Sequence, residues 1–436
     1  MFSIVSNYST FAQTPIEKKK QIVLSALLND LGEPGRWRLL FDTALQELEK
    51  RHPDLDITIK YLEFPYEQTR SHILSSMISR TPVDITTIDE IWLGEFAEKG
   101  FLTDLTDRIQ SWGRLSDWYE SNLDGMAYED KLYGLWTWTT VRAMWFWKDM
   151  LNEAGVDPNS LKTWDGYIEA AKKLNPILTP KGIQGIHLTG ANHSPDLWYP
   201  YLWMLGGSIL EKRSGHPTKE SYWFPAYNSS AGVRAMDFIK TQIDASIKPQ
   251  TNHFWGKEIL DRKFVVMLEA VQHHIHLNNT EQKQDFEQKI GLLPFPVPDE
   301  NYESSTLMGG WLLSIPTASK NKDLAWELIT VTAEPKIFAP WLAKYGYLPT
   351  QVSIGEGSFS NILNQSIPYY NQLVSMIPQL ELDLTYPNTL LSLKMLNKLS
   401  MTFIMVEKIL NRHWMMLPKS LQRFWDGDIV IQIPSS

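Results

Sequence analysis

The chain has no cysteine in its 436 residues, which excludes disulfide bonds, thiol catalysis, thiolate metal sites and a lipid anchor on a cysteine of this chain. It has no apolar run near the ~20 residues that a membrane-spanning helix needs. It also lacks a basic stripe, and its net charge of −9 makes nucleic acid an unexpected partner. What remains is a chain of ordinary globular composition, long enough for roughly two or three domain-sized units.

Motifs of catalysis and cofactor binding are also missing. The sequence contains no Walker loop and no GxSxG elbow, so we predict no cofactor and no catalytic residue. His273, His274 and His276 lie within four residues, but no HExxH accompanies them. Zinc sites need three or four ligands in fixed geometry, so we expect no metal and place these histidines in a polar loop.

Residues 1–19 have some features of an export signal. Residues 2–5 are apolar, and Thr10-Phe11-Ala12 before Gln13 has the small-residue pattern of a secretory cleavage site. The basic start and the full apolar stretch of such a signal are missing. The segment is therefore either the remnant of an export signal or a plain disordered tail.

The densest aromatic segment is YGLWTWTTVRAMWFWKD, residues 133–149, which holds four of the 18 tryptophans: Trp136, Trp138, Trp145 and Trp147. Indoles beside threonine and arginine suit the stacking of a ring-shaped polar ligand such as a sugar. Trp136 and Trp138 would share one side of a strand and form either a ligand-binding wall or packing at a hinge. Core packing is the stronger expectation for Trp145 and Trp147.

The first part of the chain follows a β-α-β-α-β order. Strands are expected at 21–28, 57–61 and 83–88, and helices at about 37–48 and 66–79. This order predicts a parallel sheet with helices on its faces, in which ligands bind at the carboxyl ends of strands. That rule selects Asp30, Glu33, Arg36 and Trp37 after the first strand, and Asp89, Glu90 and Trp92 after the third.

A second block begins near Trp145. Thr163 is expected to cap a helix that begins at Trp164. Further helices are predicted at 230–244 and 322–331, and strands at 182–188, 290–298 and 308–316.

Five stretches in order resemble the sugar-type extracellular solute-binding proteins of ABC importers, the group of the maltose- and trehalose-binding proteins. They are HPDLDITIKYLEF at 52–64, TPVDITTIDEIWLGEFAEKGFLTDL at 81–105, the segment at 131–174 that contains KLYG and TWDGYIEAAKKL, LMGGWLLSIPTASKNKDLAWELI at 307–329, and YGYLPTQ at 345–351. The resemblance covers about residues 20–380.

The resemblance implies a two-lobe α/β fold, each lobe a mostly parallel sheet flanked by helices, with the ligand held between hinged lobes. Residues 20–138 and 312–350 would form the first lobe, and 139–311 with 351–436 the second. The chain would cross between them near 136–141, 307–312 and 348–351.

Some segments depart from the family pattern. Thr140 stands where an aspartate is common in the family, so we expect Thr140 or Arg142 to make the polar contact of that aspartate. Gln272 stands where an aromatic residue is common. From about residue 379 the family pattern is lost, and residues 358–426 contain no glycine. The last part of the second lobe is therefore expected to be atypical.

The resemblance places Trp311 under the sugar, and Gly309-Gly310 would let a ligand approach the backbone closely. Charged groups such as Asp89 and Arg142 would bind hydroxyls. We therefore predict an exported, monomeric, non-enzymatic receptor that captures a carbohydrate and delivers it to the permease of an ABC importer. The alternatives are a glycan-degrading enzyme that uses two of the many carboxylates, a sugar-sensing surface module, and a receptor for a non-sugar ligand such as a polyol phosphate or peptide.

Overall fold

The computed structural model describes residues 19–188, 195–216, 219–245, 247, 257–270 and 280–382. Within these residues no helix is both long and apolar enough to cross a membrane. The predictions for His273, His274, His276 and Gln272, and those for the tail beyond residue 382, lie outside the described residues.

The predicted β-α-β-α-β order is confirmed. The elements are β1 (Lys20–Asn29), α1 (Arg36–Arg51), β2 (Leu55–Phe64), α2 (Tyr66–Ile78), β3 (Ile85–Asp89) and α3 (Glu90–Glu98). The strands lie in the order β2-β1-β3 and are parallel, so all three end at the same edge of the sheet.

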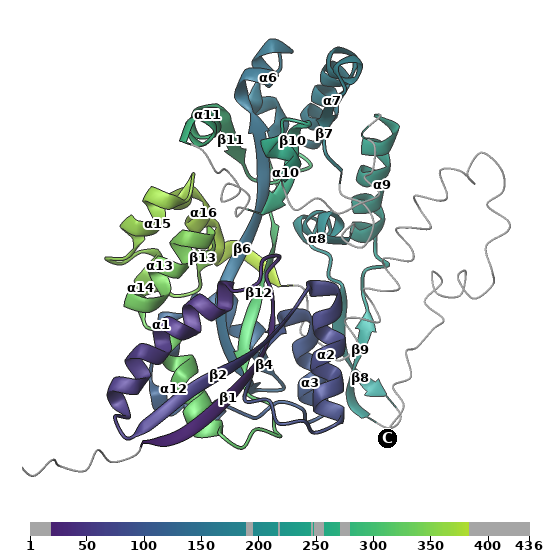
Figure 1. The fold of residues 1–436 in the computed structure, drawn as a ribbon. Coiled ribbons are helices and arrows are strands. Elements are labelled where there is room, and N and C mark those ends of the chain that lie inside the picture. Colours follow the sequence, from purple (N-terminus) through teal and green to yellow (C-terminus); the bar gives the residue numbers. More distant parts are fainter. Residues whose placement is uncertain are drawn as a thin grey trace, which may run out of the picture.

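The long strand β6 (Gly134–Trp147) connects the two ends of the molecule (Figure 1). Its first half pairs antiparallel with β12 (Thr306–Ser314) and β13 (Leu348–Pro349). Its second half, from Arg142, pairs antiparallel with β10 (Phe264–Ala270) and β11 (Ile290–Leu293). β6 therefore exchanges partners between Val141 and Arg142, and the three segments predicted to cross between lobes lie on adjacent strands.

The remaining strands complete the sheets. β7 (Gln184–Ile186) pairs parallel with β10, and β14 (Leu380–Leu382) pairs parallel with β12. Two small hairpins are β4 (Ala127–Tyr128) with β5 (Lys131–Leu132), and β8 (Leu210–His216) with β9 (Lys219–Pro225). The predicted strand at 290–298 ends at Leu293 because Pro294 follows.

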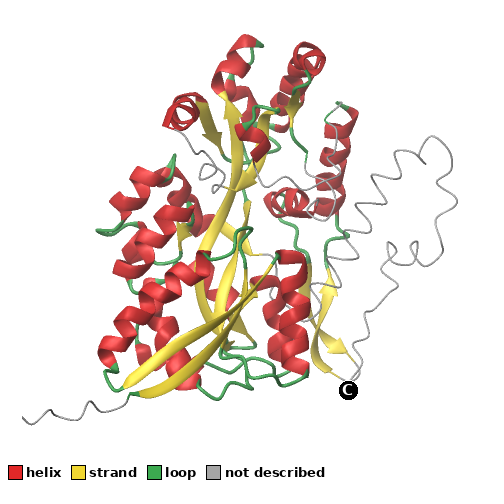
Figure 2. Ribbon diagram, viewed as in Figure 1, coloured by secondary structure: helices red, strands yellow, loops and turns green. Residues whose placement is uncertain are grey.

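Helices surround these strands in both halves of the molecule (Figure 2). The helices predicted at 164, 230 and 322 are confirmed, and the first two begin at side-chain caps, Thr163 and Ser229. The bounds beyond α3 are α4 (Thr106–Trp112), α5 (Glu120–Leu123), α6 (Lys148–Glu153), α7 (Trp164–Leu178), α8 (Pro195–Met204), α9 (Ser230–Asp244), α10 (Lys257–Leu260), α11 (Thr280–Lys289), α12 (Lys322–Thr332), α13 (Pro335–Tyr345), α14 (Val352–Gly355), α15 (Ser360–Ser366) and α16 (Tyr370–Met376).

Tryptophans occupy the core of both halves. Trp37 of α1 is fully buried and stacks on Trp341 of α13, with ring centroids 5.4 Å apart, and the indole N–H of Trp341 bonds to Arg36 O at 2.8 Å. Trp145 and Trp147 are buried as expected, and their indole N–H groups donate to backbone carbonyls. Each of these indoles thus has the polar partner that burial requires, except Trp37, whose Nε1 has none.

Replacing Trp37 by alanine should destabilise the protein by about 3–5 kcal/mol, because it opens a cavity between α1 and α13. Leu39, on the exposed side of the same helix, provides the control, and Leu39→Ala should change stability by no more than about 0.5 kcal/mol. Urea unfolding of both variants measures the difference. Equal effects would contradict the packing described for α1.

Candidate ligand-binding site

The loop after β1 carries two of the predicted site residues, Asp30 and Glu33, and α1 begins with a third, Arg36. Asp30 Oδ1 accepts a hydrogen bond from Gly32 N at 2.8 Å, and Asp30 N donates to Phe64 O at 2.8 Å. Glu33 is exposed, and its Oε2 lies 3.3 Å from Arg36 Nη2. Asp30 therefore shapes the loop, while Glu33 presents an accessible carboxylate beside a guanidinium group.

Tyr347 joins Arg36 to Trp138. The buried Arg36 donates from Nη1 to the Tyr347 hydroxyl at 2.9 Å, and the tyrosine ring stacks on Trp138 with centroids 4.2 Å apart. Burial raises the pKa of Tyr347 although Arg36 acts in the opposite direction, so the phenol stays protonated. Trp341 continues this aromatic series toward Trp37.

A β-bulge separates the two predicted wall residues of β6. Trp311 pairs with Trp138 and Leu312 pairs with Trp136, so Thr137 has no register partner on β12. The bulge breaks the alternation on which the prediction of a shared side depended. Trp136 is fully buried, and its Nε1 donates to Trp138 O at 2.7 Å. In this structure Trp136 is a packing residue with no exposed surface.

Gly310 is a glycine because Trp136 lies against it. A Cβ at position 310 would come within 2.2 Å of both Trp136 Nε1 and Trp138 O, whereas one at Gly309 would meet Thr140 Oγ1 at 3.4 Å. We predicted that a ligand would approach the backbone closely at these glycines, but at Gly310 the space is taken by an indole of the protein itself.

Trp311 is held by two aromatic rings from the carboxyl ends of β2 and β3. It meets Trp92 edge to face at 5.4 Å and Tyr66 edge to face at 6.0 Å. Trp92 is buried, Trp311 is 6% exposed and Tyr66 is partly exposed. This three-ring cluster fixes the orientation of the Trp311 indole at the edge where the parallel strands end.

Two carboxyl groups lie directly beside this cluster. Asp89 ends β3, pairs with Trp311 in the sheet register and is 7% exposed, and Glu90 begins α3 and is 5% exposed. Glu90 Oε2 accepts a hydrogen bond from Gly310 N at 3.1 Å. Burial raises the pKa of Glu90 well above its ordinary value, and the neighbouring Asp89 charge raises it further.

Thr140 and Arg142 lie on either side of the exchange of partners in β6. Thr140 Oγ1 donates to Gly309 O at 3.3 Å. Arg142 Nε lies 3.7 Å from Glu269 Oε1 of β10, and both side chains are largely buried. Arg142 of β6 and Glu269 of β10 thus lie near the same junction of strands as Gly309 and Gly310.

The predicted residues fall into three neighbouring groups: Arg36 with Trp138, Trp92 with Trp311, and Thr140 with Gly309. Sequence reasoning did not select Tyr66, Tyr347 or Glu269. Tyr66 follows β2, so the strand-end rule that selected the residues after β1 and β3 would have found it. Tyr347 and Glu269 gave no comparable signal.

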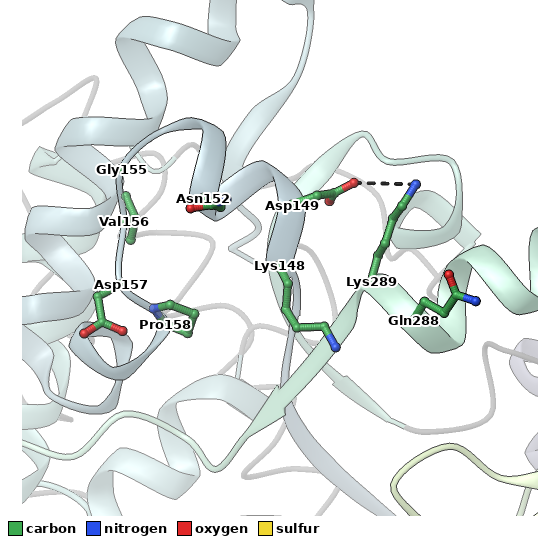
Figure 3. A pocket seen from close by; sticks show the side chains of 9 residues that line it. All are labelled: Lys148, Asp149, Asn152, Gly155, Val156, Asp157, Pro158, Gln288 and Lys289. Atoms are coloured by element: carbon green, nitrogen blue, oxygen red, sulfur yellow. Dashed lines mark ion pairs between the residues drawn. The ribbon is translucent and has the colours of Figure 1, made fainter.

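A pocket of about 720 Å³ lies elsewhere, at the end of β6 remote from β12 (Figure 3). It is lined by Lys148, Asp149, Asn152, Gly155, Val156, Asp157, Pro158, Gln288 and Lys289. Asp149 and Lys289 form an ion pair across it at 3.8 Å. None of the predicted site residues lines this pocket. Among the described residues no group of three or more His, Asp or Glu is placed to hold a metal ion.

Comparison with known proteins identifies the family. Residues 43–359 match the family described as bacterial extracellular solute-binding protein. The chain belongs to this family. The predicted family resemblance is confirmed, and the βαβ unit, the strand junction and the aromatic cluster all lie mainly within the matched residues.

Among the relatives of this solute-binding protein, the arabinooligosaccharide-binding protein of Bacillus subtilis (strain 168) is 25% identical over 295 residues, covering 65% of this chain and 64% of the relative. The mannitol-binding protein of Pseudomonas aeruginosa is 22% identical over 305 residues, covering 69% of this chain and 64% of the relative. This chain therefore spans just under two thirds of the length of each of these relatives.

A solved structure similar to this chain is maltose-bound MalE3 of T. maritima. It has a TM-score of 0.69 and 19% sequence identity, and the match covers 86% of this chain and 93% of that one. The likeness confirms the predicted two-lobe α/β fold of the solute-binding protein.

Gly310→Ala should destabilise the protein by about 1–3 kcal/mol, because the new methyl group collides with Trp136 and with the β6 backbone. Gly309→Ala is the matched control on the adjacent residue. Its methyl group makes ordinary contacts, so this variant should be neutral or up to about 1 kcal/mol more stable. Thermal and urea unfolding compare the two variants, and equal destabilisation would contradict the packing of Trp136 against Gly310.

Proposed function

We propose that this solute-binding protein is an exported, non-enzymatic receptor that captures a carbohydrate and delivers it to the permease of an ABC importer. The observation that carries the proposal is the three-ring cluster of Tyr66, Trp92 and Trp311 beside Asp89, at the junction of β3, β6 and β12. An aromatic surface next to a carboxylate suits a sugar, which has apolar C–H faces and a rim of hydroxyl groups. Relatives that bind an arabino-oligosaccharide and mannitol support the same ligand class.

The proposed lobes are residues 20–138 with 312–350, and 139–311 with 351–436. The exchange of partners in β6 at Val141–Arg142 supports a division close to this boundary, because the two halves of the strand belong to different groups of strands. β6 and β12 would serve as hinge strands, and the sugar would be enclosed when the lobes close.

We assign different roles to the predicted residues. Trp311 provides the stacking surface, and the groups that bind hydroxyls are Asp30, Glu33, Asp89, Thr140 and Arg142. Trp37 and Trp136 are fully buried and Trp92 is 2% exposed, so they support the site from behind, whereas Trp311 keeps 6% of its surface exposed beside the partly exposed Tyr66. Arg36 and Trp138 hold the β1 loop and β6 in position through Tyr347.

The free energy of binding that such a receptor needs is modest. Micromolar affinity corresponds to about −8 kcal/mol. Charge-assisted hydrogen bonds are about twice as strong as neutral ones, and the Trp311 ring is already fixed by two neighbours, so little ordering cost arises on binding.

At least one of arabinotriose, maltose and mannitol should bind the protein and raise its melting temperature. A ligand at 100 times its dissociation constant adds about 2.7 kcal/mol of stability. Trp311→Ala should abolish most of the shift, because it removes the stacking surface. Trp326→Ala is the control, since Trp326 of α12 packs against Trp112 rather than at the strand junction.

Two results would contradict this proposal. An unchanged shift in Trp311→Ala would remove Trp311 from the site. Hydrolysis of oligosaccharides such as arabinotriose or maltose by the purified protein would favour the glycan-degrading enzyme instead.

A further inference from the structure

The side chain of Glu90 takes the place of a missing strand partner. β3 ends at Asp89, whose register partner on β12 is Trp311. The preceding residue of β12, Gly310, lies beyond the end of β3. Its N–H donates instead to Glu90 Oε2 at 3.1 Å. A buried backbone N–H left unpartnered is costly, so this one carboxyl group completes the hydrogen bonding of β12 where β3 stops.

Two adjacent carboxyl groups, those of Asp89 and Glu90, lie in the protein interior beside this contact. Asp89 and Glu90 are both more than nine-tenths buried. Burying two neighbouring negative charges is unfavourable, so the protonated form of one of the two carboxyl groups is favoured. Burial first, and then the Asp89 charge, raise the pKa of Glu90, so the neutral form of Glu90 is favoured.

The elements that pack most closely against α3 carry few ionisable side chains. β12, residues 306–314, contains no ionisable side chain. Of the other elements that pack closely against α3, η2 (Asp124–Met126) and β4 contribute Asp124 and Tyr128, and α2 contributes Tyr66, whose ring lies against Trp92. On α3 itself, Glu95 forms an ion pair with Arg70 of α2. On β6, the Arg142 side chain faces Glu269 of β10.

We propose that Glu90 is a positioning residue of the sugar site: its buried carboxyl group holds the Gly310 N–H and so fixes the β12 backbone that carries Trp311. The proposal rests on the proposed function, because it assigns Glu90 a role in presenting the stacking surface. Neutral Glu90 keeps the contact at no cost in buried charge. As the pH rises and Glu90 ionises, the buried carboxylates of Asp89 and Glu90 repel each other. This repulsion weakens the hydrogen bond to Gly310 N and leaves the Trp311 side chain less firmly positioned.

The first test needs no ligand. The pKa of Glu90 is raised in the folded state, so its contribution to stability is fully present below the ordinary value of 4.5 and is lost as the pH rises through the folded value. Glu90→Gln keeps an oxygen acceptor for Gly310 N and cannot ionise. Its melting temperature should therefore rise relative to wild type as the pH increases from 5 to 8.

Glu98→Gln is the matched control, since Glu98 is exposed at the other end of the same helix. Its melting temperature should follow wild type across the whole range. Parallel pH curves for wild type and Glu90→Gln would overturn the assignment of a neutral, buried Glu90.

The second test measures sugar affinity by calorimetry, using whichever of arabinotriose, maltose and mannitol stabilises the protein. Wild type should bind more weakly at pH 8 than at pH 5. Glu90→Gln should bind as well as wild type does at pH 5 and lose the pH dependence. Glu90→Ala leaves Gly310 N unpartnered and should weaken binding by roughly tenfold at both pH values.

Glu90→Ala and Glu90→Gln with the same affinity as wild type at both pH values would overturn the positioning role. Failure of all three sugars to bind any variant would contradict the proposed function instead. The pH dependence of the melting temperature would still decide, by itself, whether neutral Glu90 holds the Gly310 N–H.

Discussion

The structure depends on one continuous strand that belongs to two groups of strands. β6 pairs with β12 and β13 up to Val141 and with β10 and β11 from Arg142 onward. A strand interior cannot leave its backbone groups unpaired, so every neighbour of β6 must end or begin close to this junction. Ends of strands, glycines and polar side chains are therefore gathered at one place, where we propose that the ligand binds.

The packing around the junction is unequal on the two sides of β12. On one side Trp136 fills the space at Gly310 and leaves no room for a methyl group. On the other, Tyr66 and Trp92 support Trp311, and Glu90 supplies the hydrogen bond that β3 no longer provides. Buried aromatic rings thus give the junction its rigidity, and one carboxyl group makes part of that rigidity sensitive to protonation.

The sequence was sufficient for the order of elements and for the edge of the sheet where polar residues gather. Hydrophobic periodicity placed β1, α1, β2, α2 and β3 within a few residues, because these elements depend on local patterns. The bulge at Thr137 was not predictable, since it arises from how β6 fits β12 and Trp136 fits Gly310. Tyr347 was missed because its partner Arg36 is 311 residues away, and no local pattern encodes such a contact.

We propose that the two halves joined by β6 close on a sugar, and a distance measurement across them tests this closure directly. The chain has no cysteine, so Lys99→Cys at the end of α3 and Lys172→Cys on α7 provide two unique sites for spin labels on exposed positions. Double electron–electron resonance should show a shorter and narrower distance distribution when a binding sugar is added at saturation. An unchanged distribution, with sugar binding verified by calorimetry on the same labelled protein, would contradict the hinged closure.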